Sequence, residues 1–319
     1  MVKFIITGDW HWRGSNSKNR LDNYQEALTT KIREVFTLAK KHNAAAILQP
    51  GDLTHSPNIS LNTLGDFADL LRESPAPIIS IPGNHDTGCG NLEVLPRTPF
   101  GLLSRLGLIW NVHGSNKFIR NILISGHGYN YQTDIDKLQY TFSDLAKASV
   151  MPTTTIHLTH GMLLEKAPGF DMRYTLISEL ELLPYLPDVL VVGHEHIGFG
   201  IKEITNKVTG KRCLVINPGA LGRLTAHLEE IERQIQVCLL TIDGDKISAE
   251  LIPLQSAKPG HEVLSREHIE AEQEREERMQ KFLALLAEEG QGKFMEVLDI
   301  IEDIAAREML PEEVKQEAL

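Results

Sequence analysis

The chain has 319 residues, of which 42% are hydrophobic, and it carries a formal net charge of −11 at pH 7. Its length allows one large domain with an appendage, or two domains. So acidic a chain is a poor freestanding nucleic-acid binder, because phosphate contacts need Lys and Arg. No apolar run nears the roughly 20 residues of a membrane span. We therefore expect no membrane segment and, from the absence of an export signal and the three widely spaced cysteines, a cytoplasmic protein.

The first 200 residues alternate between short apolar runs and amphipathic stretches. Each run is rich in β-branched residues and ends in Gly plus polar residues, which is typical of strands followed by helices. The predicted strands are residues 2–7, 44–48, 77–81, 155–159 and 189–192. Apolar residues at helical spacing predict two helices, at residues 27–39 and 61–71. This alternation indicates an α/β fold.

The pattern changes after residue 212. Closely spaced strand-like segments at residues 213–216, 235–241 and 247–254, with a hairpin turn at 243–245, predict antiparallel strands that complete a sandwich. A Glu-rich helix-loop-helix with two apolar stripes follows. We therefore expect a domain at residues 1–255, a linker at 256–264 and an acidic helical appendage at 265–319. The appendage holds 16 acidic and 7 basic residues, a net charge of −9, which leaves −2 for residues 1–264.

Each of the five strands of the alternating region ends in candidate metal ligands. In open α/β sheets, the carboxyl ends of the strands form the site, so these clusters can converge. Residues two apart in extended chain point the same way, which predicts that Asp9 lies beside His11, and His194 beside His196. Carboxylate, imidazole and amide ligands together suit Mn, Fe or Zn better than Ca or Mg. The clusters contain Asp9 and His11, Asp52, Asn84 with His85 and Asp86, His160, and His194 with His196.

This ordered set resembles the calcineurin-like metallophosphoesterase superfamily over about residues 1–255. The resemblance implies a sandwich of two central mixed β-sheets flanked by helices, with two divalent metals that activate water for attack on phosphorus. One metal would be held by Asp9, His11, Asp52 and His196. The other would be held by Asp52, Asn84, His160 and His194, so that Asp52 bridges the pair. The remaining His85 would be the general acid or would stabilise the transition state, with Asp86 orienting its ring.

The segment Gly-Asp-Leu-Thr-His-Ser at residues 51–56 resembles the SbcD-type branch of DNA repair nucleases. That resemblance implies a DNA exonuclease and endonuclease that uses Mn, with Fe, Zn or Mg as alternatives, and His55 positioning the DNA phosphate. It also implies an SbcC-like SMC-family ATPase as partner of the appendage, and a homodimer. Arg13, Arg20 and Arg223 are candidate DNA-backbone contacts, with solvated surface arginines as the alternative. The family's usual capping domain has little room in this chain.

Several alternatives stay open. The enzyme could hydrolyse small phosphodiesters or nucleotides, or the chain could be a non-catalytic metal-bound scaffold. The appendage could pack on the sandwich instead of on a partner. Strand alternation predicts that His157 is a buried structural histidine. His127 is interpreted as a loop residue, Trp10 and Trp12 as packing residues, and Cys89 as a bystander thiol.

Overall fold

The computed structural model describes residues 1–88, 90–142, 152–267, 275–284, 302 and 304–308. The chain divides into two compact units, Met1–Leu264 and Ser265–Leu319. Within the described residues, helices are too short or too polar to cross a membrane. Cys89 and most of the predicted appendage lie outside the described residues.

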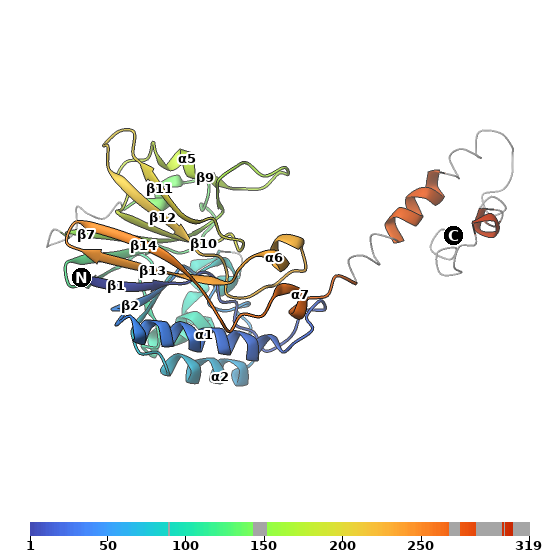
Figure 1. The fold of residues 1–319 in the computed structure, drawn as a ribbon, viewed down its shortest axis with the longest axis horizontal. Coiled ribbons are helices and arrows are strands. Elements are labelled where there is room, and N and C mark those ends of the chain that lie inside the picture. Colours follow the sequence, from blue (N-terminus) through green and yellow to red (C-terminus); the bar gives the residue numbers. More distant parts are fainter. Residues whose placement is uncertain (89, 143–151, 268–274, 285–301, 303, 309–319) are drawn as a thin grey trace. The chain divides into compact units, whose positions relative to one another are not determined.

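The first unit is built on two six-stranded mixed sheets, as the α/β sandwich prediction requires (Figure 1). In the first sheet, β1, β2, β3 and β4 are parallel, and β13 and β14 continue it antiparallel. Their bounds are β1 Val2–Ile6, β2 Ala46–Gln49, β3 Ile78–Ser80, β4 Trp110–Asn111, β13 Gln236–Asp243 and β14 Lys246–Pro253.

The second sheet also has four parallel strands, but they lie between two antiparallel edge strands. Its order is β11-β12-β10-β7-β6-β5, with β11 and β5 antiparallel to their neighbours. The bounds are β5 Asn116–Ile119, β6 Ile122–His127, β7 Thr154–Gly161, β10 Val189–His194, β11 Gly200–Thr205 and β12 Arg212–Asn217. The prediction that the segment at 213–216 belongs to a purely antiparallel set is wrong, because β12 runs parallel to β10. An apolar run predicts that a strand forms, but not whether the neighbouring strands run parallel or antiparallel to it.

The two sheets face one another across an apolar layer. Alternate residues of each strand point to opposite faces, so Phe4 and Ile6 face the second sheet while Ile5 faces the helices. Across the layer, Ile156 and Leu158 of β7 are fully buried. A parallel sheet needs both faces covered, and the helices supply the outer cover of the first sheet.

The helices α1 (Tyr24–Lys41) and α2 (Leu61–Arg72) cover that outer face, as Figure 1 shows. Each begins at a polar cap, because the side chain of Asn23 accepts a hydrogen bond from the backbone of Glu26, and Ser60 does the same for Thr63. Both predicted helices are confirmed. Their apolar stripes pack on the sheet at helical spacing.

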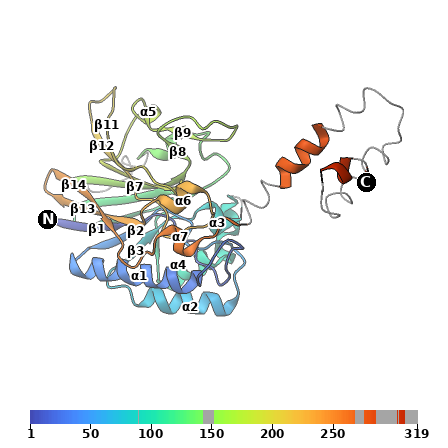
Figure 2. The same cartoon turned by 45° about the vertical axis from the view of Figure 1, so that its right-hand side comes forward.

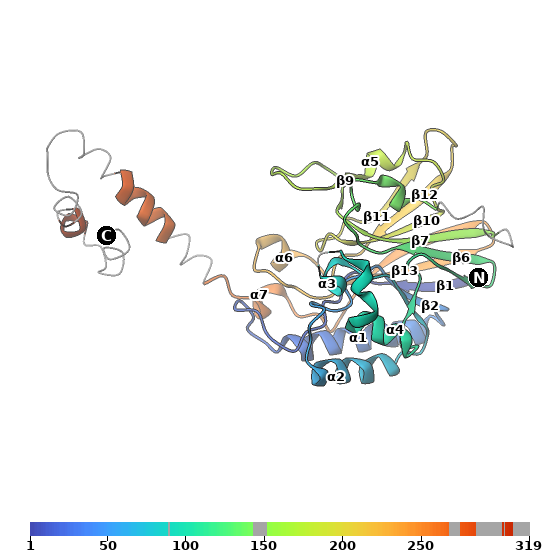
Figure 3. The same cartoon turned by 180° about the vertical axis from the view of Figure 1, so that it is seen from behind.

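Shorter elements lie at the ends of the strands and on the outer faces of both sheets. Figures 2 and 3 show α3, α6 and α7 gathered at one edge of the sandwich, with α5 and β9 above the second sheet. The parallel strands end at the edge where α3, α6 and α7 lie. The bounds are α3 Asn84–Thr87, η1 Leu92–Arg97, α4 Pro99–Arg105, η2 Lys137–Tyr140, β8 Leu163–Leu164, β9 Thr175–Leu176, α5 Ile177–Leu180, α6 Leu228–Glu232 and α7 Gly260–Val263.

Residues 256–264, expected as a linker, instead pack on the first unit. Val263 and Leu264 are each 3% exposed, and the backbone of Leu264 pairs with that of Arg20. A side chain at Gly260 would meet the carbonyl oxygen of Ile231 at 2.1 Å. The first unit therefore extends to Leu264.

We predict that truncation after Leu264 leaves the unfolding free energy of the first unit within about 0.5 kcal/mol, because its three apolar cores lie within residues 1–264. Truncation after Gln255 removes two buried apolar side chains and should cost about 1.5–3 kcal/mol for each. Urea unfolding of the two truncated chains checks this. Unfolding of the longer one would show instead that the appendage packs on the sandwich.

Candidate metal centre

The carboxyl ends of β1, β2, β3, β7 and β10 bring the predicted ligands together. Three groups of side chains have ligand atoms within 4.8 Å of one another among the described residues, and Asp52 belongs to two of them. The first contains Asp9, His11, Asp52 and His196, and the second Asp52, His160 and His194. The amide oxygen of Asn84 lies 3.0 Å from Nε2 of His160, so Asn84 joins the second group. All seven predicted ligands therefore lie in one place.

One oxygen of Asp52 lies between the two groups. Oδ2 is 3.6 Å from Nε2 of His11 and 3.4 Å from Nε2 of His160. Oδ1 accepts a hydrogen bond from the backbone N–H of His85 at 2.8 Å. Oδ2 is buried and has no hydrogen-bond partner among the described residues. A buried carboxylate oxygen without a donor is costly, and a shared cation would compensate it.

The backbone places these side chains by left-handed conformations, not by the extended chain that the sequence analysis assumed. His11 and Asp52 have φ of 51°, and His194 has φ of 87°. Such values are uncommon for non-glycine residues and persist where the surroundings enforce them. His194 and His196 enter different groups, whereas Asp9 and His11, also expected side by side, share one.

Two glycines allow the loops to approach closely. A Cβ at Gly83 would lie 2.1 Å from Oδ1 of Asp52. Gly51 has φ of 102°, and a Cβ there would lie 2.4 Å from Nδ1 of His160. Any side chain at either position would displace a predicted ligand, so the Gly-Asp and Gly-Asn-His-Asp motifs need their glycines for space as well as for bending.

The protonation equilibria of the site differ between its residues. Burial lowers the pKa of His11 well below its usual value and that of His194 to about 4, so both rings are neutral with a lone pair to offer. Burial opposes ionisation of Asp52, but His160 and His11 hold its pKa far below the usual range. Burial also disfavours the charged form of His160, yet Asp52 raises its pKa to about 9. Ionised carboxylates and neutral imidazoles are the forms that bind metals, so His11 and His194 are ready to bind, whereas a metal at His160 would have to displace the proton that Asp52 stabilises there.

The residues present fit two divalent cations. The donors combine carboxylate, imidazole and amide oxygen, and Nε2 of His11 and of His196 converge to 2.9 Å. Nδ1 of His160 donates to the carbonyl of Pro50 at 2.7 Å, which directs Nε2 toward Asp52. The buried groups are consistent with a dinuclear metal site.

His85 and His55 stand beside the first group. Their rings stack with centroids 5.0 Å apart, and both meet the ring of His11 edge to face. Nδ1 of His85 donates to the carbonyl of His55 at 2.8 Å, which leaves Nε2 for a reacting group. The ring nitrogens of these three histidines also lie within 4.8 Å of one another, close enough to hold a cation. The structure thus brings both predicted catalytic histidines to the site.

The expectation that Asp86 orients the ring of His85 is corrected by the structure. The carboxylate of Asp86 accepts hydrogen bonds from the backbone of Leu53, Thr54 and Gly83. It therefore ties the loop after β2 to the loop after β3, while the carbonyl of His55 holds the imidazole. Because α3 turns between the two residues, adjacent side chains leave in different directions.

The three candidate DNA-contact arginines differ in position. Arg13 lies at the site, with Nη1 3.3 Å from Nε2 of His55. Arg20 pairs with Asp22, and its side chain is 2% exposed. Arg223 is 5% exposed and donates to the carbonyls of Glu230, Lys258 and Arg233. Inward-facing guanidinium groups cannot reach a DNA backbone, so the predicted contact is wrong for Arg20 and Arg223.

Sequence reasoning missed three residues around the ligands. The ring of Tyr129 lies 5.4 Å from that of His194, and the hydroxyl of Tyr24 donates to the carbonyl of His11. Glu230 lies 4.0 Å from Nδ1 of His196. None follows a predicted strand, so no motif singled them out.

The interpretation of His157 as a structural residue is confirmed. It is buried, bonded to the hydroxyl of Ser125 and close to the carbonyl of Gln139. Trp10 and Trp12 are also buried and pack on Phe67, as expected. His127 ends β6, so its interpretation as a loop residue is wrong.

The profile of the calcineurin-like phosphoesterase family matches residues 2–198, which hold all the proposed ligands. The chain belongs to this family. It is accordingly a metal-dependent phosphoesterase. No curated protein matches the sequence.

Two solved structures illustrate the likeness. One is the crystal structure of TT1561 of Thermus thermophilus, which is 16% identical over 78% of this chain and 98% of that one, with a TM-score of 0.49. The other is described as a novel archaeal phosphodiesterase, 16% identical over 79% of this chain and 100% of that one, with a TM-score of 0.36. Likeness of this degree says nothing about substrate.

We predict that Asp52→Asn removes both metals together, because an amide cannot neutralise two cations. Metal affinity should fall by more than the roughly 10- to 100-fold that loss of a ligand's hydrogen-bond partner costs. Elemental analysis of the purified variant measures this, with Asp245→Asn in the exposed β13–β14 turn as the matched control. Unchanged metal content in Asp52→Asn would contradict the bridging role.

Proposed function

We propose that the chain is a two-metal phosphodiesterase that acts on small phosphodiesters or nucleotides. The proposal rests on Oδ2 of Asp52, which lies between two ligand groups without a hydrogen-bond partner among the described residues. His85 lies beside these two groups and belongs to neither. That arrangement provides for two cations and one separate proton donor.

The proposed reaction is hydrolysis of a phosphodiester bond. Two bound divalent cations, with Mn as the proposed metal and Fe, Zn or Mg as alternatives, would activate water and offset charge on the phosphoryl oxygens. His85 would hold a proton at Nε2 for the leaving oxygen, since its Nδ1 is committed to the carbonyl of His55. Asp86 would keep the two loops in register.

The charges around the site favour a small substrate. Of the three arginines considered for DNA, only Arg13 lies at the metal centre. Residues 1–264 carry a net charge of −2, which provides little attraction for a polyanion. A half-buried tyrosine, Tyr129, flanks the second group and offers an aromatic surface to a substrate.

A second candidate is a DNA nuclease of the SbcD type. The observation in its favour is the pair formed by His55 and Arg13 beside the first ligand group. In this version His55 positions the DNA phosphate, and the appendage at 265–319 contacts an SbcC-like SMC-family ATPase. Homodimer formation is also part of this second proposal. The chain truncated after Leu264 is the variant that tests the ATPase contact.

We predict that His85→Ala keeps its metals and loses about 10²- to 10⁴-fold in turnover, the range typical for a general acid or base. Metal analysis and kinetics with a generic aryl phosphodiester measure the two effects. His261→Ala, at an exposed position in α7, is the control. Loss of a metal from His85→Ala would make His85 a ligand.

We predict that the Mn-loaded protein hydrolyses an aryl phosphodiester and cyclic nucleotides, and leaves linear duplex and single-stranded DNA intact. Parallel assays on these substrates, with wild type and His55→Ala, check the prediction. DNA cleavage that His55→Ala slows more than diester cleavage would select the nuclease. Full metal content without hydrolysis of any substrate would select a non-catalytic scaffold.

A further inference from the structure

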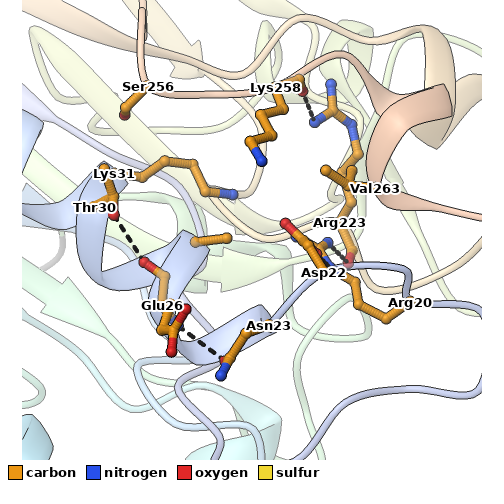
Figure 4. A pocket seen from close by; sticks show the side chains of 11 residues that line it. Arg20, Asp22, Asn23, Glu26, Thr30, Lys31, Arg223, Ser256, Lys258 and Val263 are labelled. Carbon is orange, nitrogen blue, oxygen red and sulfur yellow. Dashed lines mark hydrogen bonds and ion pairs between the residues drawn. The ribbon is translucent and has the colours of Figure 1, made fainter.

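A second polar pocket lies within the first unit, apart from the proposed ligands. Its volume is about 230 Å³, and its walls come from the first half of α1, the loop before it, Arg223 and the segment leading to α7. Figure 4 shows these side chains around the cavity. The charged residues among them are Arg20, Asp22, Glu26, Lys31, Arg223 and Lys258.

Positive charge exceeds negative charge in this pocket. Four of the six charged side chains are basic, and Asp22 is taken up by its ion pair with Arg20. Arg223 donates only to backbone carbonyls and has no carboxylate partner among the described residues. Glu26 is the second acidic residue, so the four basic and two acidic side chains leave the lining with a net positive charge. The pocket therefore holds uncompensated cations.

Lys31 is the least expected of these cations. Its side chain comes from the middle of α1 and is 4% exposed. The ammonium donates to the carbonyl of Leu221, which satisfies one of its three N–H groups, and it forms no ion pair with any described residue. Buried ammonium groups are costly unless paired with an anion. Burial, with repulsion from Arg20, Arg233 and Arg223, lowers the pKa of Lys31 to about 7.

Lys258 faces Lys31 across the cavity. In Figure 4 the two side chains extend their amino groups toward one another. Lys258 is exposed, and its amino group also has no ion-pair partner among the described residues. Two like charges that converge on one cavity repel each other, and an anion between them would turn that repulsion into attraction.

We propose that this pocket binds a phosphate-type dianion, held by Lys31 and Lys258 and stabilised by the charge of Arg223. The cavity is smaller than the roughly 300–1,000 Å³ of sites for drug-sized ligands, which suits inorganic phosphate or a small phosphomonoester. Ammonium groups bind phosphate oxygens by charge-assisted hydrogen bonds. This site is independent of the reaction proposed for the metal centre.

The pocket shares backbone with the metal centre. Leu221, whose carbonyl binds Lys31, donates its N–H to the carbonyl of Asp9 at 2.8 Å. The next residue back, Ala220, donates to the carbonyl of His196 at 2.9 Å. An anion that draws Lys31 away from Leu221 therefore acts on the segment that supports two proposed ligands.

Calorimetric titration of the metal-loaded full chain with inorganic phosphate, at constant ionic strength, tests the proposal. Because phosphate also binds at metal centres, the wild-type titration can contain two binding events. The variants show which of them belongs to the pocket. Lys258→Ala and Lys31→Met should each weaken this event by about tenfold or more, the effect of losing one charge-assisted hydrogen bond. Lys40→Ala, an exposed lysine at the far end of α1, should bind as the wild type does.

A parallel titration with a single-stranded oligonucleotide that lacks terminal phosphate separates the two sources of phosphate. If Lys258→Ala loses binding of both the oligonucleotide and free phosphate, the pocket also accepts the phosphate of a polymer. Loss of phosphate binding alone supports the free anion. Because Lys258 is exposed, Lys258→Ala changes no buried group, and unchanged binding of both probes in this variant would overturn the proposal.

Discussion

The buried carboxylate of Asp52 is the constraint around which the first unit is arranged. Its Oδ2 has no hydrogen-bond donor in the described part of the chain, and imidazole nitrogens from both sheets lie within 3.4–3.6 Å of it. A charge in that position has to be compensated, since a buried ion without a partner is strongly destabilising. The two sheets therefore have to end at the same edge. The left-handed backbone at Asp52 and the missing side chains at Gly51 and Gly83 let the loops come close enough.

The surrounding polar groups hold this arrangement from outside the ligand sets. Asp86 links the loops after β2 and β3 through backbone N–H groups, and the hydroxyl of Tyr24 supports the backbone at His11. The segment around Leu221 connects Asp9 to the buried Lys31. The metal centre and the proposed anion pocket thus share one backbone segment. An anion bound in the pocket would therefore act on the segment that supports Asp9.

The sequence contained most of the information needed for the fold and the ligand set. Apolar runs followed by Gly and polar residues located β1, β2, β3, β7 and β10, and the order of their motifs located every proposed ligand. The direction of β12 depends on its neighbour in space, which its own residues do not encode. The inward orientation of Arg223 depends on carbonyls from distant segments. The role of Asp86 depends on the turn of α3, which neighbouring positions in the sequence conceal.

The central claim is that one carboxylate joins two cations while His85 stays free. Crystals grown with Mn and measured at its absorption edge test this most directly. The account predicts two anomalous peaks about 3.5–4 Å apart, one on each side of the carboxylate of Asp52. A single peak, or a peak among the rings of His11, His55 and His85, would contradict it.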